Sequence, residues 1–594
     1  MILGFSFAAW LTIAVVLAIF GTLIFTKLPA DAVFLGCIAI LFTSGVLDTK
    51  EALAGFCNTS VVMVGALFIV VEGLVRTGVL HWMMRHLLGT PSNWSRAIVR
   101  LMLPVAALSS FLSNTTVVAL FVNVVRLWAR KLGISPSKLL IPLSYASGMG
   151  GICTLIGTPP NLIISGMYTE RTGLHMNMFT PLVPGLFCLA VGVFAILALR
   201  RLLPDRKAPE DAFSNTSDYT AEFIVPSTCR HVGETVGEAG LIEVRGGQLL
   251  EVVGFDDEVV SPVRADTPVV GGDRLIYCGA IDELLELRTT HGLINADKPV
   301  FTLAEEDRSR QLKTACVRFG SALIGHTWSE HHLKGQTELT LVAVSRHGER
   351  LQDVPRQIKL KAGDTLLIEC APHATTFGPE IEKALEFFDS DEVVTTGWGT
   401  FVSSLIMLAM VALSALKIVP LLQSCFAAAL AMVVFRCCSP RQAMKSINWS
   451  ILMIFAGSVV LGSAIQKTGL AEALANGVVH LCGPHPLLVM CAVTLAATFI
   501  TEFISNTAAG AMFCPIVYET ATSLECDPLP FLVALMIAVS SSFATPIGSS
   551  THMLVYGPGG YRFTDFLKIG FWMNLIILAA NLLIVNLLWP IHAI

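Results

Sequence analysis

The sequence predicts an α-helical polytopic membrane protein in which two related halves flank a soluble insert. Three observations carry this prediction. Hydrophobic residues make up 54% of the 594 residues and charged residues only 14%, whereas charged residues are about a quarter of an ordinary soluble domain. Of the 44 Asp and Glu residues, 33 lie between Asp205 and Glu392, so one polar segment interrupts an apolar chain. Several motifs of the first half also recur, in order, in the second half.

Long runs almost free of charge indicate the spanning helices, each of which needs about 17 to 25 residues. Shorter runs broken by Gly, Pro, Asn or Ser are typical of re-entrant or unwound segments inside the protein. We expect about ten to twelve crossings. The first run has no basic residue before it and no small-residue cleavage site, so we expect it to stay as a helix. The clearest runs are 7–25, 30–46, 61–75, 182–199, 401–416, 487–499 and 571–588.

Three motifs repeat at an offset of about 390 residues. Repeated halves with Gly/Pro-interrupted hydrophobic segments at corresponding positions are the pattern of a secondary transporter whose site lies at the repeat interface. A duplication that serves packing alone does not explain why polar residues occur at both interruptions. The pairs are Asn58-Thr-Ser with Asn448-Trp-Ser, Leu112-Ser-Asn-Thr-Thr with Ile504-Ser-Asn-Thr-Ala, and Gly157-Thr-Pro-Pro with Ala544-Thr-Pro-Ile.

The insert contains a repeat of its own, at an offset of about 91 residues. Val232-Gly-Glu-Thr and Gly271-Gly-Asp-Arg match Ile324-Gly-His-Thr and Ala362-Gly-Asp-Thr. Short β-rich runs alternate with turns, so each copy should be a small α+β module. We expect strands at 249–253, 274–278, 339–345 and 365–369. The expected division is 1–206 and 396–594 for the transmembrane halves, and 207–300 and 301–395 for the two modules.

The two modules resemble RCK-C (TrkA C-terminal) domains in the G-x-T opening and the late G-D-x-L strand. Such domains often accompany a nucleotide-binding half that carries G-x-G-x-x-G, which is absent here, so we expect no organic cofactor. A module that binds a small regulatory ligand or dimerises, and a scaffold with no sensing role, both stay open. Arg126, Arg130, Arg200 and Arg201 precede the insert, which places it in the cytoplasm by the positive-inside rule. We expect a cell membrane, and specifically a bacterial inner membrane.

Hydroxyl and amide side chains occur within apolar sequence at 109–116 and 501–507. Polar groups at membrane depth are costly unless they are paired, so they indicate a site. In each half a hydroxyl, Ser109 or Thr501, stands four residues before the Ser of a Ser-Asn-Thr triplet, on the same helical face. Hydroxyl, amide and backbone carbonyl oxygens suit a hard cation such as sodium. Free N–H groups at broken helices favour an anion.

Neither Lys nor Arg occurs in the four stretches around these motifs, which are 109–120, 144–165, 501–513 and 540–556. Burying an anion without compensation is prohibitive, so a bound anion would need bound cations. The sequence therefore predicts a carrier that couples sodium to a small oxyanion, and it predicts no nucleic-acid partner. A membrane enzyme has little support, because HExxH, G-x-S-x-G after a strand and the Walker loop are all missing.

Across both membrane halves, the chain resembles the divalent anion/sodium symporter family of the ion-transporter superfamily. The resemblance implies two inverted repeats, re-entrant hairpins with the triplets at their tips, a homodimer in the lipid membrane and an elevator-type motion. It implies one sodium site at Ser109, Ser113, Asn114 and Gly157, and a second at Thr501, Ser505, Asn506 and Ala544. It implies substrate contacts from Asn114, Thr115, Thr158, Asn506, Thr507, Thr545 and Pro546.

The stretch from Thr545 to Phe566 resembles the branch of that family with RCK-C inserts, which includes algal sulfate/sodium transporters. We therefore expect sulfate as the substrate, with di- or tricarboxylates as the alternative. The chain departs from that branch at Ser549-Ser-Thr-His552, where Tyr-Gln-Thr-Asn is usual. It departs from dicarboxylate carriers because they tend to repeat Pro-Pro-Asn in the second half.

For each of three titratable residues, the sequence leaves two roles open. Glu502 either takes up protons and tunes cation binding or caps a helix and contacts the backbone. Glu72 either relays protons or pairs with a cation near the interface. His552 either contacts the anion or packs as a neutral polar residue. A sodium/proton antiporter of the same superfamily would need an intramembrane carboxylate such as these, and a potassium channel would need a TVGYG-like filter, which the sequence lacks.

Overall fold

The computed structural model describes residues 6–590 with internal gaps. The gaps are at 27, 29, 58, 80–87, 90, 92, 207–219, 245–246, 256–258, 261–262, 280–283, 285–286, 297–310, 329–338, 352, 371–380, 382–383, 388–396, 417, 471–472, 474–476 and 478–484. Asn58 and the expected domain boundaries at 207, 300–301 and 395–396 lie outside the described residues.

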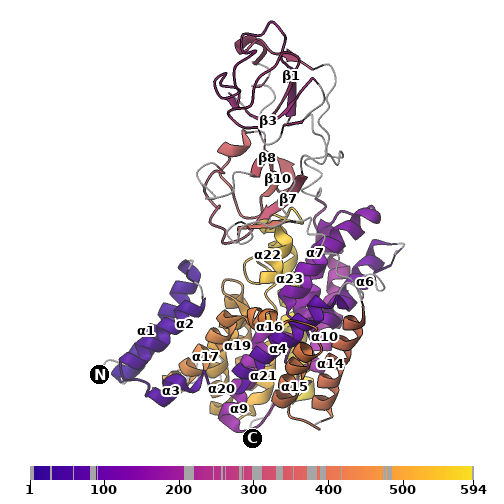
Figure 1. Ribbon diagram of the computed structural model, residues 1–594. Coiled ribbons are helices and arrows are strands. Elements are labelled where there is room, and N and C mark those ends of the chain that lie inside the picture. Colours follow the sequence, from indigo (N-terminus) through magenta and orange to yellow (C-terminus); the bar gives the residue numbers. More distant parts are fainter. Residues whose placement is uncertain are drawn as a thin grey trace.

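Helices form the parts of the chain before and after the insert (Figure 1). Before the insert they are α1 (Phe7–Phe25), α2 (Ala30–Thr43), α3 (Thr49–Ala54), α4 (Thr59–Arg76), α6 (Trp94–Ser109), α7 (Asn114–Lys131), α8 (Ser137–Gly151), α9 (Pro159–Thr172), α10 (Leu182–Ala198) and the 3₁₀ turn η1 (Leu199–Leu202). After the insert they are α14 (Trp398–Ala415), α15 (Leu421–Val434), α16 (Pro440–Ser446), α17 (Trp449–Lys467), α19 (Pro486–Thr501), α20 (Asn506–Ser523), α21 (Pro528–Ser540), α22 (Ser550–Tyr556) and α23 (Phe563–Leu588).

The helical part has the character of a polytopic membrane protein. Within the described residues, Leu182–Leu202, Trp449–Lys467 and Phe563–Leu588 are long and apolar enough to cross a membrane. Shorter apolar helices, among them α2, α14, α15, α19 and α21, accompany them. Large apolar side chains such as Phe194, Leu408 and Leu430 point outward and are 74%, 66% and 65% exposed. Exposed side chains of this kind are expected where lipid, rather than water, is the solvent.

Two antiparallel sheets make up the insert and stack above the helices in Figure 1. The first has the order β2-β3-β5-β1-β6 with β4 beside β3, and the second has the order β11-β7-β10-β8-β9. The first sheet consists of β1 (Thr220–Ile224), β2 (Glu243–Val244), β3 (Gly247–Val253), β4 (Val259–Val260), β5 (Arg274–Gly279) and β6 (Ile294–Asn295). The second consists of β7 (Gln311–Val317), β8 (Leu339–Arg346), β9 (Glu349–Arg350), β10 (Thr365–Cys370) and β11 (Leu385–Phe387).

The two sheets repeat one pattern of pairing, in which a late strand lies between two earlier ones. β5 pairs with β1 and β3, and β10 pairs with β7 and β8. The turn before each late strand is held in the same way, because Asp273 accepts from the N–H of Val270 and Asp364 accepts from the N–H of Lys361, both at 2.8 Å. All four strands expected from the sequence of the insert are present, in β3, β5, β8 and β10.

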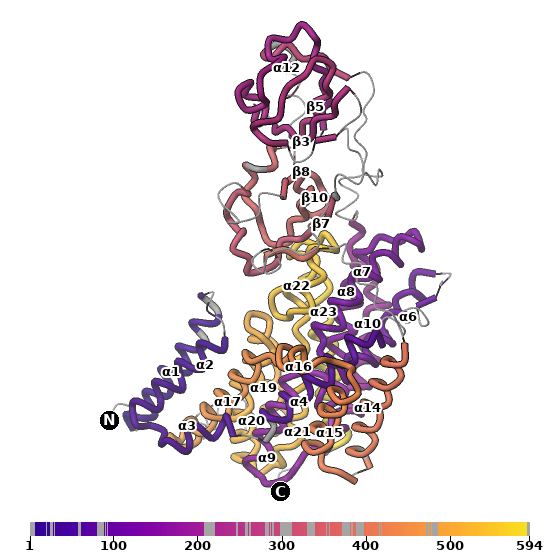
Figure 2. The backbone as a smooth tube through the Cα atoms, viewed as in Figure 1, coloured from indigo at the N-terminus to yellow at the C-terminus, as the bar shows by residue number. Residues whose placement is uncertain are grey.

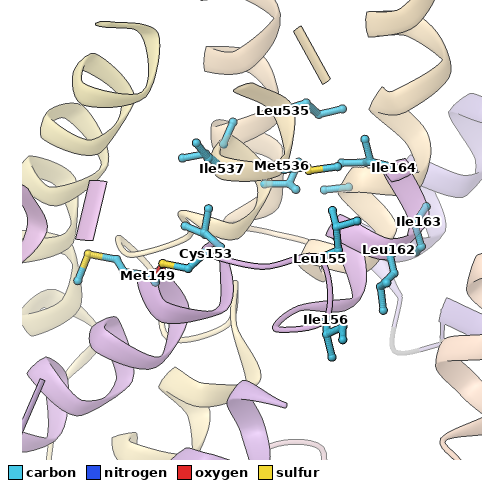
Figure 3. Close-up of a cluster of buried hydrophobic side chains, with 14 of the residues drawn as sticks. Met149, Cys153, Leu155, Ile156, Leu162, Ile163, Ile164, Leu535, Met536 and Ile537 are labelled. Carbon is cyan, nitrogen blue, oxygen red and sulfur yellow. The ribbon is translucent and has the colours of Figure 1, made fainter. Parts of the chain in front are cut away.

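Segments far apart in the sequence pack together within the helical part. α9 lies against α20, and α17 lies against α2 and α20 (Figure 2). Arg171 of α9 pairs with Glu519 of α20 at 2.5 Å. Buried side chains around the break between α8 and α9 and from α21 fill one cluster, which Figure 3 shows with Met149, Leu155 and Met536 among its members. This packing brings the end of one half against the end of the other.

Candidate functional site

The first Ser-Asn-Thr triplet lies at a break between two helices. α6 ends at Ser109, and α7 begins at Asn114, with four non-helical residues between them. Ser109 Oγ lies 2.6 Å from a terminal atom of the Asn114 amide and 2.8 Å from Ser147 Oγ. The same amide atom lies 3.2 Å from the Ser147 carbonyl oxygen and 3.3 Å from that of Gly157. One end of the Asn114 side chain is therefore surrounded by oxygen atoms.

The second triplet repeats this arrangement. α19 ends at Thr501 and α20 begins at Asn506. One terminal atom of the Asn506 amide lies 2.8 Å from Thr501 Oγ1, 3.1 Å from Ser542 Oγ, 3.2 Å from the Val539 carbonyl oxygen and 3.0 Å from the Gly548 carbonyl oxygen. An amide nitrogen at that position donates to these oxygens, whereas an amide oxygen joins them as one more ligand of a cation.

A second pair of breaks faces the triplets. The first lies between α8 and α9, where Thr154 Oγ1 donates to the Ser110 carbonyl and accepts from the N–H of Gly157 at 3.2 Å. The second lies between α21 and α22. There Thr545 Oγ1 donates to the carbonyl of Glu502 at 2.7 Å and accepts from the N–H of Gly548 at 3.0 Å. Thr154 and Thr545 therefore make equivalent hydrogen bonds in the two halves.

The helices that follow these breaks also begin alike. Thr158 precedes α9 with φ −144° and ψ 140°, and Ser549 precedes α22 with φ −134° and ψ 137°. Asn161 donates from Nδ2 to the Gly151 carbonyl at 3.3 Å. His552 occupies the corresponding place in α22, and its Nε2 lies 2.6 Å from the Ser542 carbonyl.

Glu502 is a structural carboxylate at the second break. It is 5% exposed. Its Oε1 accepts from the N–H of Ala544 at 2.9 Å and from Asn574 Nδ2 at 2.5 Å, and its Oε2 accepts from the N–H of Thr545 at 2.8 Å. Three donors thus satisfy the two oxygen atoms of the carboxyl group, and they tie the ends of α19 and α21 to α23. Of the two roles considered for Glu502, these contacts match the contact with the backbone.

His552 is buried and has both ring nitrogens engaged. Nε2 faces a carbonyl, which accepts only, so Nε2 carries the hydrogen. Nδ1 then accepts from Ser144 Oγ at 2.6 Å. The ring lies 5.2 Å from that of Tyr145 and 5.4 Å from that of Phe566. His552 is therefore a neutral packed residue in this arrangement, and Ser144 joins it to the first half.

The expected site residues divide into accessible and buried ones. Ser505 and Thr115 are exposed. Ser550, which was not among the expected site residues, is also exposed, and its hydroxyl lies 2.7 Å from that of Thr115 across the two halves. Ser113, Asn114, Asn506 and Thr507 are half-buried, whereas Ser109, Gly157, Thr158, Thr501, Ala544, Thr545 and Pro546 are buried. Glu72 pairs with Arg76 at 2.8 Å, one helical turn along α4.

Comparisons with known proteins agree on the class of protein to which the chain is similar. The family model of the citrate transporters matches residues 15–537, and again residues 459–591. The chain belongs to the citrate transporter family. The transporter is 31% identical to an uncharacterized transporter of Synechocystis, over 98% of this chain and 97% of the other.

Two further relatives of this citrate transporter family member have names that state a substrate. The probable sodium/sulfate cotransporter 3 of Chlamydomonas reinhardtii is 24% identical over 89% of this chain and 82% of its own length. The sodium-dependent dicarboxylate transporter SdcS of Staphylococcus saprophyticus is 30% identical over 25% of this chain and 28% of its own length. The family and these relatives are transporters rather than enzymes.

Sequence reasoning missed several groups of the transporter that the structure brings to the triplets. Ser147, Ser542 and the carbonyl of Val539 lie outside the repeated motifs, so no motif marks them. Ser550 lies in the stretch Ser549–His552, whose only signal in the sequence is its departure from the family branch. The signal that would have found Gly548 is its spacing, because Gly157 and Gly548 both stand three residues after a threonine, Thr154 or Thr545.

Proposed function

We propose that the protein couples sodium to the transport of a small divalent oxyanion, with sulfate as the leading substrate. The observation that carries the proposal is the pair of matched oxygen clusters around Asn114 and Asn506. Each combines a hydroxyl, an amide and backbone carbonyls, which are hard neutral ligands for a hard cation. Sodium coupling is supported by the names of the two relatives that specify sodium.

Electrostatics supports the coupling of the two ions. The stretches that form the clusters contain neither Lys nor Arg, and both nitrogens of His552 are engaged. A dianion at this site would therefore lack a cationic side chain, and the charge of bound sodium would compensate it. Hydroxyls and free N–H groups at the broken helices would orient its oxygen atoms.

The proposed first sodium site consists of Ser109, Ser113, Asn114 and Gly157. For the second, the proposed side chains are Thr501, Ser505 and Asn506. The hydrogen bonds of Thr545 match those of Thr154. They favour an alignment of the two halves in which Gly548 corresponds to Gly157, four residues later in the second half than the motif alignment gives. We therefore add the Gly548 carbonyl to the candidate backbone ligand from the Ala544 position.

The proposed substrate contacts are Asn114, Thr115, Asn506 and Thr507, together with Thr158, Thr545 and Pro546 from the family pattern. The later alignment adds Ser549 and Ser550 opposite Thr158 and Pro159, and Ser550 is exposed beside Thr115. Thr545 is 8% exposed, and its hydroxyl already has two partners. We therefore rank Ser550 above Thr545 as a substrate contact.

The finer architecture is part of the same proposal. The two halves would be inverted repeats with re-entrant hairpins, working by an elevator motion in a homodimer. The chain would divide at 206/207, 300/301 and 395/396, with two RCK-C-like modules in the cytoplasm of a cell of bacterial type. Basic residues near the insert, among them Arg126 and Arg206, support this orientation.

Uptake of radiolabelled sulfate and of succinate into proteoliposomes, each with sodium or with choline, tests the substrate. The proposal predicts saturable sulfate uptake that needs sodium and that unlabelled succinate inhibits weakly. Saturable succinate uptake with no competition by sulfate would instead establish the di- or tricarboxylate alternative. The family description favours keeping citrate as a third competitor in the same experiment.

A further inference from the structure

The second sheet of the insert rests directly on the helical part. Phe319, just after β7, stacks edge-on against Tyr556, the last residue of α22, with ring centroids 5.2 Å apart. His347, in the turn between β8 and β9, places Nδ1 at 2.9 Å from the carbonyl oxygen of Tyr561. Figure 1 shows this sheet immediately above α22 and α23. The first sheet lies farther from the helices.

The contact is close at two glycines, one on each side, and Gly363 also has a φ of +84°, which by itself favours glycine. A Cβ atom at Gly363, in the turn before β10, would lie 2.8 Å from the ring of Tyr556. A Cβ atom at Gly557 would overlap Sγ of Cys316 at the end of β7. Gly557 has φ −65° and ψ −55°, which any residue adopts, so the approach of the insert and not the backbone conformation calls for glycine there.

α22, whose last residue contacts the second sheet, begins at the candidate site. α22 is seven residues long, and it runs from Ser550, beside Thr115, to Tyr556 under the insert. Tyr561 fastens the other end of the segment to α8, because its hydroxyl accepts from the N–H of Ile141 at 3.0 Å. A displacement of the insert therefore reaches Ser550 through two turns of helix.

The same sheet also faces the helix that begins at the first triplet. Arg126 of α7 and Arg318 lie near Glu386 of β11, and both oppose the rise that burial causes in the pKa of the Glu386 carboxyl. Arg126 stands twelve residues after Asn114, which is about 18 Å along the helix. α7 and α22 are packed against each other. The second sheet therefore contacts the far end of α22 and lies near Arg126 of the adjacent helix α7, and the near ends of these two helices carry Ser550 and Thr115.

We propose that the second sheet of the insert is a positioning element of the transport site, which holds α7 and α22 in the register that keeps Thr115 and Ser550 together. Its contacts with Tyr556, Gly557 and Tyr561 couple the state of the insert to the affinity of the site for sodium and substrate. This inference rests on the proposed function for the identity of those ions. The coupling is reciprocal, because two linked sites change each other's affinity by the same factor.

The test first disrupts the contact between Gly557 and Cys316 with one substitution and then relieves the clash with a second. Gly557→Ala in the full-length protein pushes the insert away, whereas Cys316→Ala in addition removes the sulfur atom that the new methyl group meets. Sodium affinity is measured in detergent from the sodium-dependent rise in melting temperature, with choline at equal ionic strength. Hydrogen exchange of residues 556–561 is measured with and without sodium in parallel.

We expect Gly557→Ala to raise the sodium concentration for half-maximal stabilisation by about fivefold or more, the lower end of ordinary allosteric couplings. The double variant should return to within about twofold of the wild type, and sodium should slow exchange in 556–561. Phe255→Ala is the matched control, because Phe255 lies in the turn after β3 of the first sheet and is 87% exposed. It should change nothing.

Unchanged sodium affinity in a folded Gly557→Ala protein would overturn the inference, and so would a loss that Cys316→Ala fails to restore. If Gly557→Ala does not fold, Phe319→Ala decides by the same criterion, because it removes only the ring that packs on Tyr556. Failure of the proposed function gives a different result: the wild-type protein itself would show no sodium-dependent stabilisation. The two failures are therefore distinguishable.

Discussion

Replacement of Glu502 by Gln tests whether this carboxylate holds the second break together or carries a proton. In the wild type it accepts from Ala544, Thr545 and Asn574. Gln keeps the shape and one acceptor oxygen, but it turns an NH₂ group toward at least one of these donors. One buried N–H then loses its partner, which costs about 1–3 kcal/mol. The break lies next to Gly548, so the cost should appear largely as weaker ion binding.

A cost of that size corresponds to an increase of about 5- to 150-fold in the half-saturating sodium concentration, if it falls wholly on the ion-bound arrangement. Sodium-dependent substrate uptake into proteoliposomes measures this increase. Thermal unfolding of the same samples measures any part of the cost that falls on the fold. Glu72→Gln is the matched control, because Glu72 is paired with Arg76 near the surface. Loss of such a pair costs about 0.2–1 kcal/mol.

Two results would refute this reasoning. The first is Glu502→Gln protein with wild-type stability and wild-type sodium dependence, which would mean that the three donors contribute nothing. The second is loss of proton-coupled sodium flux. That outcome would assign proton transfer to Glu502 and favour the antiporter alternative, whereas retained anion uptake would favour the symporter.

Three shorter predictions concern the site, the anchoring of the insert and the insert itself. Ser550→Ala should weaken substrate uptake by about 5- to 12-fold, the cost of about 1–1.5 kcal/mol for a lost hydrogen bond, with a rise in KM as the readout. Arg206→Gln should lower the melting temperature, because it leaves the buried Asp565, which Arg206 holds at 2.8 and 3.0 Å, without its cation. Burial, His231 and Arg230 lower the pKa of His291. The insert should therefore lose stability as pH falls below the ordinary histidine pKa of about 6.5, and His291→Gln should flatten that dependence in a pH series of melting curves.

Each of these has its own contrary result. Unchanged KM in Ser550→Ala would remove that hydroxyl from the substrate contacts. An unaltered melting temperature in Arg206→Gln would show that Asp565 finds other donors. A pH profile of His291→Gln that is as steep as that of the wild type would move the titration to another group.

The helices and the insert strands were predictable because their signals are local. Charge-free runs marked α1, α2, α14 and α19 within a few residues, and β-rich runs marked four strands of the insert. α23 starts eight residues before the run that predicted it, at Phe563. The added turns carry Asp565 and Lys568, and the capping contact between Asp565 and the N–H of Arg562 begins the helix there.

The candidate site was predictable only in part. Ser109 with Asn114 and Thr501 with Asn506 could be expected because they are close in the sequence. The expected helical face shared by Ser109 and Ser113, and by Thr501 and Ser505, is wrong, because α6 ends at Ser109 and α19 ends at Thr501, so each triplet serine lies in the break after its helix. The carbonyl oxygens of Val539 and Gly548 were not, because a backbone atom has no sequence signature. The pairing of Gly157 with Ala544 followed a shared Thr-Pro dipeptide, whereas the hydrogen bonds of Thr154 and Thr545 give a different register. Those hydrogen bonds can be identified only from the folded structure.

The coupled flux of sodium and anion is the most direct test of the central claim. Radioactive sodium and labelled sulfate are followed in the same proteoliposomes at fixed pH, for the wild type and for Asn114→Ala and Asn506→Ala. We predict sodium influx that depends on sulfate, with more than one sodium ion for each sulfate, and a loss of both fluxes in either variant. Sulfate uptake that proceeds equally well in choline, with no accompanying sodium, would contradict the account.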